Sequence, residues 1–196
     1  MGRPRLFELD AAIASALDVF WKHGYAATTP AELLDAIGVG KGSFYNTFES
    51  KHAIFEQTLR RYGDDRVAGL ARSLSGTGRI GQRVKRYLER LASPENVALL
   101  RRGCFAANTA GELGGHDPAA TKIVRDTFQR MERVIEASFT EAQERGELDR
   151  SLDAKATAAL LLATLIGISV IARVDEPAAL AKRTAQAFSA LLAAVG

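Results

Sequence analysis

This chain of 196 residues contains one cysteine, one tryptophan and three histidines. A lone cysteine cannot form a disulfide within the chain, and Cys104 has no CxxC partner that would indicate a structural zinc site. The histidines are scattered, and neither an HExxH nor a phosphate-loop spacing occurs. We therefore predict no enzyme activity, no metal and no cofactor.

Signals for export, membrane insertion and β-strands are also missing from the sequence. The first ten residues lack the apolar core of a signal peptide, and no stretch alternates like a half-buried strand. The uncharged run 156–172 is shorter than the roughly 20 residues that a membrane span needs. These absences favour a cytoplasmic, all-α protein with no membrane partner.

The net charge of +3 does not by itself identify a partner. Residues 1–52 carry five basic and six acidic side chains, so any nucleic-acid contact there must depend on individual positions. The basic excess lies at residues 79–102, where seven basic residues stand against two acidic ones. We interpret that segment as a solvated helix face.

Apolar residues recur at helical spacing along nearly the whole chain. In the first part of the chain they predict helices at 6–23 and 30–37, a helix of eight residues soon after Ile37, and a helix from after Ser50 to about Arg72. In the second part they predict helices at 79–92, 95–101, 103–114, 118–145, 154–173 and 177–194. We predict two domains, an N-terminal one over 1–52 and a helical regulatory and dimerisation domain over 53–196.

The stretch GVGKGSFYNTFESK, residues 38–51, joins two short predicted helices. Thr29 and Glu32 can form a capping box at the start of the first of them, and Pro30 suits its first position. Gly38 suits the positive φ that ends this helix, and Gly40 occupies the cap of the next. This is the size and turn of a helix-turn-helix, whose second helix enters the DNA major groove. From spacing alone, an αα-corner with a solvated polar face remains the alternative.

Helical geometry divides the second of these helices into two faces. Phe44 and Phe48 point to one side and anchor the helix in the core. The opposite face carries Gly42, Ser43, Tyr45 and Asn46, and Lys41 and Lys51 bracket the helix as phosphate contacts. Gly42 has no side chain and allows the backbone to approach DNA closely.

The block from Ala16 to Tyr62 resembles the DNA-binding domain of the TetR/AcrR family of bacterial transcriptional regulators. The matching positions are Phe20, Gly24-Tyr25, Thr28-Thr29, Gly38-Val39, Lys41-Gly42-Ser43, Tyr45, Phe48 and Ser50-Lys51. RRGCFAANTAGEL and ARVDEPAAL are more weakly similar to the regulatory half of one branch. The resemblance implies an all-α homodimer that binds a palindromic double-stranded DNA operator, usually as a repressor, and releases it when a small-molecule effector fills the C-terminal domain.

The resemblance also implies roles for individual residues. Thr29, Tyr45 and Lys51 match phosphate contacts, whereas Lys41, Gly42, Ser43, Asn46 and Thr47 match base-reading and groove-contacting positions. Arg3 and Arg5 resemble a basic arm for the minor groove, with a disordered tail as the alternative. Two positions depart from the pattern, because Gly40 replaces a capping Ser or Thr and Leu34 replaces a small Ala.

Two sites are predicted in the second domain. An apolar effector pocket with a few polar groups would be formed by Phe105, Asn108, Thr109, Glu112, Phe128 and Met131, unless these residues simply pack a core. The helix over 154–173 is apolar nearly all round, which favours a subunit interface over coverage within one monomer. With the last helix it would supply the interface residues Leu161, Leu165, Ile168, Phe188 and Leu191.

An alternative function is a thiol redox sensor that acts through Cys104. Arg101 and Arg102 precede it and a predicted helix N-terminus follows Gly103, and both features favour a thiolate. The competing interpretation is a small buried side chain among Phe105, Ala106 and Ala107.

Overall fold

The computed structural model describes residues 3–174 and 177–194, with side chains from residue 9 onward and without that of residue 177. Within this part the chain is all-α and contains no strand. The helices are α1 (Arg3–His23), α2 (Pro30–Ile37), α3 (Lys41–Phe48), α4 (Lys51–Leu74), α5 (Ile80–Leu91), α6 (Val97–Arg101), α7 (Phe105–Leu113), α8 (Pro118–Glu144), α9 (Ala154–Ile171) and α10 (Pro177–Ala193). The predicted fold class is confirmed.

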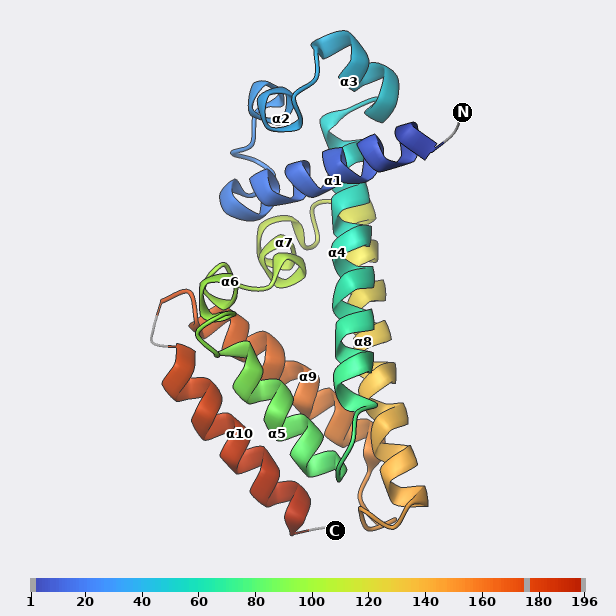
Figure 1. The fold of residues 1–196 in the computed structure, drawn as a ribbon, viewed down its shortest axis with the longest axis vertical. Helices are drawn as coiled ribbons and strands as arrows, with labels where there is room; N and C mark the ends of the chain where they lie inside the picture. Colours follow the sequence, from blue (N-terminus) through green and yellow to red (C-terminus); the bar gives the residue numbers. More distant parts are fainter. Residues whose placement is uncertain (1–2, 175–176, 195–196) are drawn as a thin grey trace.

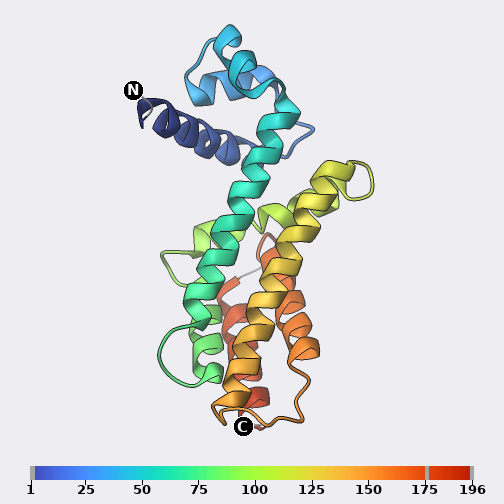
Figure 2. The same ribbon diagram turned by 90° about the vertical axis from the view of Figure 1, so that its right-hand side faces the viewer.

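The molecule is elongated, with α1, α2 and α3 gathered at one end (Figure 1). α4 runs from this end into the body of the molecule, and α8 lies beside it (Figure 2). α5 and α9 pack against the lower halves of these two long helices, and α10 packs on α5 (Figure 1). The long helix α4 is therefore a continuous connection between the two ends of the protein.

Two clusters of buried apolar side chains form the core. The first joins α1, α2, α3 and the upper part of α4 to α7 and the start of α8, and the second joins the lower part of α4 to α5, α8, α9 and α10. α4 contributes Phe55 and Leu59 to the first cluster and Leu70 and Leu74 to the second. One helix therefore contributes to both cores, and the apolar clusters do not mark a boundary at residue 52. The division into domains at this residue stays a prediction.

The local signals at the helix-turn-helix are confirmed by the backbone. The Thr29 hydroxyl accepts from the Glu32 N–H at 3.3 Å, and the Glu32 carboxylate accepts from the Thr29 N–H at 2.7 Å, which completes the capping box. Gly38 ends α2 at φ 75°, in the left-handed region. Gly40 caps α3 in an extended conformation without a side-chain hydrogen bond.

The basic segment 79–102 is not simply a solvated face, and that interpretation was wrong for Arg83. This side chain is fully buried, and its Nη1 donates to the Leu74 carbonyl at 2.7 Å. Its Nη2 lies 3.4 Å from Oε2 of Glu147, which also accepts from the Ile80 N–H at 2.6 Å. The pair therefore ties α5 to the loop that follows α8.

Helix α9 buries one face and leaves the other open. Leu161, Leu165 and Ile168, together with Phe188 of α10, are buried within the core of the single chain. They cannot also form an intermolecular surface, so their assignment to a dimer interface is corrected; of the five predicted residues only Leu191 is exposed. By length and composition α9 could cross a membrane, but its inner face packs against α8.

Candidate nucleic-acid interface and ligand cavity

Helix α3 presents the two faces that its sequence predicts. Phe44 and Phe48 are 0% and 3% exposed and fix the helix against the first core cluster. Tyr45 is 38% exposed, and its ring meets that of Phe44 edge-on with the centroids 5.2 Å apart. The side chains on the outer face of α3 therefore do not take part in packing the core.

The outer face of α3 is open where a nucleic acid would approach. Lys41, Gly42, Ser43 and Asn46 are all exposed, and a Cβ atom built on Gly42 would meet nothing within 4 Å. Thr47 is also exposed, but its hydroxyl donates to the Ser43 carbonyl at 2.9 Å. Packing within the described part of the chain therefore does not require a glycine at position 42.

Two flanking positions lie beside this face. The Lys51 ammonium is 4.4 Å from the centroid of the Tyr25 ring, a cation–π contact that orients it. The Thr29 hydroxyl donates to Glu32 at 2.9 Å, so a phosphate would have to compete with the capping box. The side chains of Arg3 and Arg5 lie outside the described residues. The DNA roles of all these residues remain predictions.

Glu112 makes contacts that its assignment to an effector pocket did not anticipate. Its carboxylate accepts from the backbone N–H groups of Tyr25 and Ala26, at 3.0 Å and 2.7 Å, in the turn between α1 and α2. Gly24 permits this contact, because its φ is 81° and an added Cβ would lie 2.8 Å from the Glu112 carboxylate. Glu112 therefore fastens α7 to the helix-turn-helix end of the molecule.

A second link between the two ends passes through Arg102. Its guanidinium donates to the Asp18 carboxylate at 2.8 Å and to the Asp18 carbonyl at 3.1 Å. The same guanidinium lies 4.4 Å from the centroid of the Trp21 ring, also on α1. The position of α1 is thus coupled to the short segment between α6 and α7.

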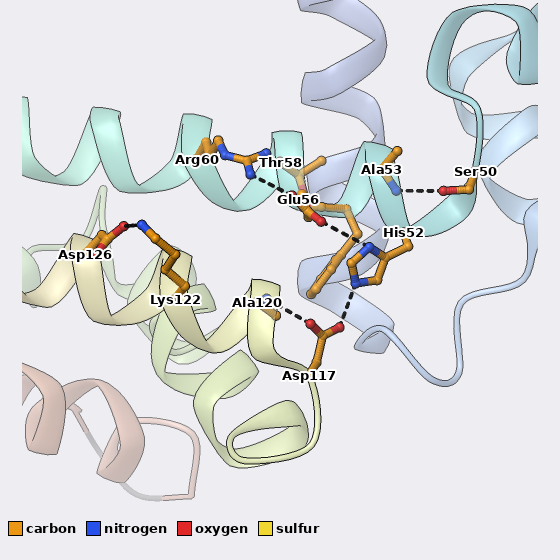
Figure 3. A network of polar contacts seen from close by, with 11 residues as sticks. Ser50, His52, Ala53, Glu56, Thr58, Arg60, Asp117, Ala120, Lys122 and Asp126 are labelled. Atoms are coloured by element: carbon orange, nitrogen blue, oxygen red, sulfur yellow. Dashed lines mark hydrogen bonds and ion pairs between the residues drawn. The ribbon is translucent and has the colours of Figure 1, made fainter.

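A third link joins the start of α4 to the start of α8 (Figure 3). His52 Nε2 lies 2.7 Å from Oδ2 of Asp117, and its Nδ1 lies 3.2 Å from Glu56. Asp117 caps α8 by accepting from the Ala120 N–H at 2.9 Å. This N–H lowers the pKa of Asp117 below its usual value, burial opposes the shift, and the hydrogen bond with His52 adds to it.

We expect Asp117→Asn to remove a pH-dependent part of the stability. Asparagine still caps a helix but carries no charge, so the variant should lose about 1 kcal/mol at pH 7. Because the pKa is lower in the folded state, this difference should be complete above the ordinary value of 3.8 and should vanish as the pH falls through the folded value. Urea unfolding between pH 3 and pH 7 measures it. Asp35→Asn, at an exposed carboxylate, is the control, and a difference that persists at the acid end would contradict this assignment.

A cavity of about 320 Å³ lies between the two ends of the molecule. It is bordered by residues of α4, α5 and α6, by Trp21 of α1 and by Ser169 of α9. The polar and aromatic residues of its lining are Trp21, Asp65, Arg66, Tyr87, Arg90, Asn96 and Ser169. A space of this size is at the lower end of the range for small-molecule sites.

None of the six predicted pocket residues borders this cavity. Phe105 and Met131 are buried core residues, and Asn108 donates to the Arg102 carbonyl and accepts from Arg173. Thr109 and Phe128 line a separate, mainly apolar hollow of about 300 Å³. The six residues predicted to form one effector pocket therefore lie in different places: some are in the core, some link helices, and some lie at the surface.

Arg66 and Trp21 were missed as candidate site residues, although a sequence signal existed for Arg66. Leu59, Tyr62, Arg66 and Leu70 follow one another at three- and four-residue spacing. Arg66 therefore shares the inner face of α4 with apolar neighbours, where a charged side chain requires a reason.

Cys104 is 8% exposed and lies in the first core cluster. Its sulfur accepts a hydrogen bond from the Tyr62 hydroxyl at 3.3 Å. Burial raises the pKa of this tyrosine, and the neighbouring cysteine adds to the shift. This environment does not favour a reactive thiol that acts as a redox sensor.

The comparisons with known proteins agree with the geometry. A model of bacterial regulatory proteins of the tetR family matches residues 12–58, and a model of the tetracyclin repressor-like C-terminal domain matches residues 77–188. The chain belongs to the TetR family. It is a DNA-binding transcriptional regulator of the kind that this family comprises.

Individual relatives extend the similarity over most of the chain. The HTH-type transcriptional repressor ComR of Escherichia coli K12 is 29% identical over 173 residues, which cover 88% of this chain and 82% of ComR. A TetR-family regulator from Cytophaga hutchinsonii has the same fold, with a TM-score of 0.86 at 19% identity, covering 95% of this chain and 93% of that one. A cysteine-substituted CifR, solved with 26 bp operator DNA, has a TM-score of 0.81 at 22% identity, covering 93% and 95%.

Proposed function

We propose that this TetR-family protein is a ligand-responsive repressor that binds a palindromic operator as a homodimer in the cytoplasm. The observation that carries the proposal is the outer face of α3, which is anchored from behind by Phe44 and Phe48 and has an uncovered glycine in its first turn. Such a helix can enter the major groove with its backbone close to the bases. The family consists of regulators, and we propose no enzyme activity.

In this proposal Lys41, Gly42, Ser43, Asn46 and Thr47 face the bases and the groove walls. Tyr45, Lys51 and Thr29 contact phosphates, and Arg3 and Arg5 reach the minor groove. The phosphate contacts position the protein without reading the sequence, so affinity should fall steeply with salt. The polar groups on α3 would supply the base readout.

The dimer interface in this proposal is the outer surface of the last two helices. Large apolar side chains are exposed there, with Leu160 at 54%, Val170 at 51%, Val174 at 87% and Leu191 of α10 at 58%. Gly167 lies in the same row and has open space around it. Large exposed apolar side chains on neighbouring helices are typical of an interaction site when they lie together, and a two-fold arrangement would bury them against their copies.

We expect Leu160→Glu to convert the dimer into monomers. A glutamate at this position would place two like charges in an apolar two-fold interface without a partner. Light scattering after size-exclusion chromatography measures the mass. Leu99→Glu is the matched control because Leu99 is exposed on α6, and it should leave the dimer intact. A dimeric Leu160→Glu variant would place the interface elsewhere.

The effector in this proposal occupies the cavity of about 320 Å³. Its support is that Trp21, a residue of α1, forms part of the lining, so that a bound molecule would touch the DNA-binding end directly. Ligand-dependent release requires only that the ligand binds more tightly to the conformation that does not fit the operator.

The decisive experiment is selection of bound fragments from a random double-stranded DNA pool. We expect enrichment of a palindrome whose half-sites are about 34 Å apart, or a multiple of this distance, on one face of the duplex. Selection without enrichment at low salt would refute DNA binding, and an asymmetric site would refute the two-fold mode.

A further inference from the structure

The charged groups of the cavity are unevenly distributed. Arg66, Arg90 and Asp65 border it. Arg66 is half-buried, whereas Arg90 and Asp65 are exposed, so that water screens the last two more strongly. Arg90 also donates to the Ser73 hydroxyl at 2.5 Å. Of the charged groups that border the cavity, Arg66 is therefore the one that water screens least.

Arg66 has no anionic partner within the part of the chain that the structure describes. Its contact is with the Tyr62 ring, whose centroid lies 5.7 Å from the guanidinium carbon. Burial is the main cause that raises the pKa of both Tyr62 and Tyr87, so these neighbouring phenols are neutral and do not balance its charge. A half-buried guanidinium that no carboxylate neutralises can pair with a ligand's anion without giving up an existing ion pair.

Trp21 borders the same cavity from the DNA-binding end. Its indole N–H is buried and has no acceptor in the described structure. Its ring packs edge-on against Tyr62, with centroids 5.1 Å apart, and contacts the Arg102 guanidinium that holds Asp18. A molecule that presses on Trp21 would therefore disturb the contact that fixes α1.

We propose that the cavity binds a small monocarboxylate, with its carboxylate on Arg66 and its short apolar body against Trp21 and Leu100. This inference rests on the proposed function and names the chemical class of the effector. The volume of about 320 Å³ favours a compact molecule. Through Trp21, Arg102 and Asp18 the bound ligand shifts α1 relative to α7 and thereby changes the position of the recognition helix.

The single tryptophan makes this site directly observable. Trp21 fluorescence and the melting temperature are followed while butyrate, octanoate or benzoate is added to the full-length protein. The corresponding amides, butyramide, octanamide and benzamide, have the same shape without the charge. We expect a saturable change with at least one carboxylate, and binding of its amide that is weaker by about tenfold or more.

Substitution of Arg66 separates charge recognition from general apolar binding. Arg66→Met should weaken carboxylate binding about tenfold or more, and Arg66→Lys should retain part of it because the charge remains without the planar fork. Arg150→Met removes an equal charge from an exposed loop and should bind like the parent. Each variant is first shown to retain its melting transition and its affinity for the selected operator.

The coupling is tested with Asp18→Ala, because Asp18 holds the Arg102 guanidinium but does not border the cavity. This variant should still be stabilised thermally by the carboxylate, but the carboxylate should release the selected operator less completely. Release that is as complete as in the parent would overturn the proposed route through Trp21, Arg102 and Asp18.

Three results would contradict carboxylate binding without contradicting DNA regulation. If the amides bind as well as the acids, if Arg66→Met binds the acids normally, or if no acid has an effect at 10 mM in a protein that binds its operator, the monocarboxylate proposal fails and DNA regulation stands. A protein that selects no DNA refutes the proposed function instead, whatever the cavity binds.

Discussion

Replacing Gly42 with leucine is expected to abolish specific operator binding and leave the fold intact. Nothing lies within 4 Å of the position that the new Cβ would occupy, and the neighbouring residues of this face are exposed, so we expect the chain to accommodate the side chain. Leucine is also a better helix former than glycine, by up to about 1 kcal/mol. The variant should therefore melt at or above the temperature of the parent.

On DNA the same side chain would stand between the helix backbone and the groove. Because specific contacts depend on close approach, we expect the affinity for the selected operator to fall by about 100-fold or more, toward the non-specific level. Fluorescence anisotropy with a labelled operator at fixed salt measures this loss.

Gly111 provides the matched control for this substitution. It is also a helical glycine with open space around it, but it lies in α7, away from α3. Gly111→Leu should bind the operator like the parent. If Gly42→Leu also bound normally, α3 would not approach DNA through this face.

Glu147→Gln is expected to cause the largest loss of stability among the substitutions considered. It retains the size of the side chain and its capacity to accept from the Ile80 N–H, but it leaves the fully buried Arg83 without a counter-charge. Removing one partner of a buried ion pair costs about 3 kcal/mol or more. For a chain of this length, about 3 kcal/mol corresponds to a melting temperature lower by about 6–12 °C.

A double-mutant cycle tests whether this loss comes from the pair. Arg83→Met together with Glu147→Gln removes both charges, and the double variant should be more stable than the sum of the single losses predicts, by about 1–3 kcal/mol. Urea unfolding at pH 7 supplies the free energies. If the losses of the two single variants simply add up in the double variant, the charge of Glu147 does not interact with Arg83.

The helices and their ends were predictable because they depend on neighbours in the sequence. The capping box at Thr29 and Glu32, the left-handed Gly38 and the opposed faces of α3 all lie within a few residues of one another. Spacing alone is sufficient for such features, since side chains three and four positions apart must meet on a helix. The family resemblance rested on the same residues and is confirmed.

The candidate sites beyond α3 were predicted less well because they depend on how helices turn toward one another. α9 is apolar on every side, so its composition could not show that Leu161 faces inward while Leu160, one residue away, faces out. Glu112 was assigned to a pocket from its helix face, but its carboxylate reaches a turn 86 residues earlier in the chain. Contacts across such separations have no periodic signature.

The sequence by itself therefore determined the all-α fold, the two-faced α3 with its bare Gly42, and the family. The tertiary structure alone decided that Trp21 of α1 and Arg66 of α4 border one cavity, and that Arg83 is buried against Glu147. The physical reason is that helix formation and capping follow from local backbone geometry, whereas a cavity and a buried charge are defined by the packing of distant segments.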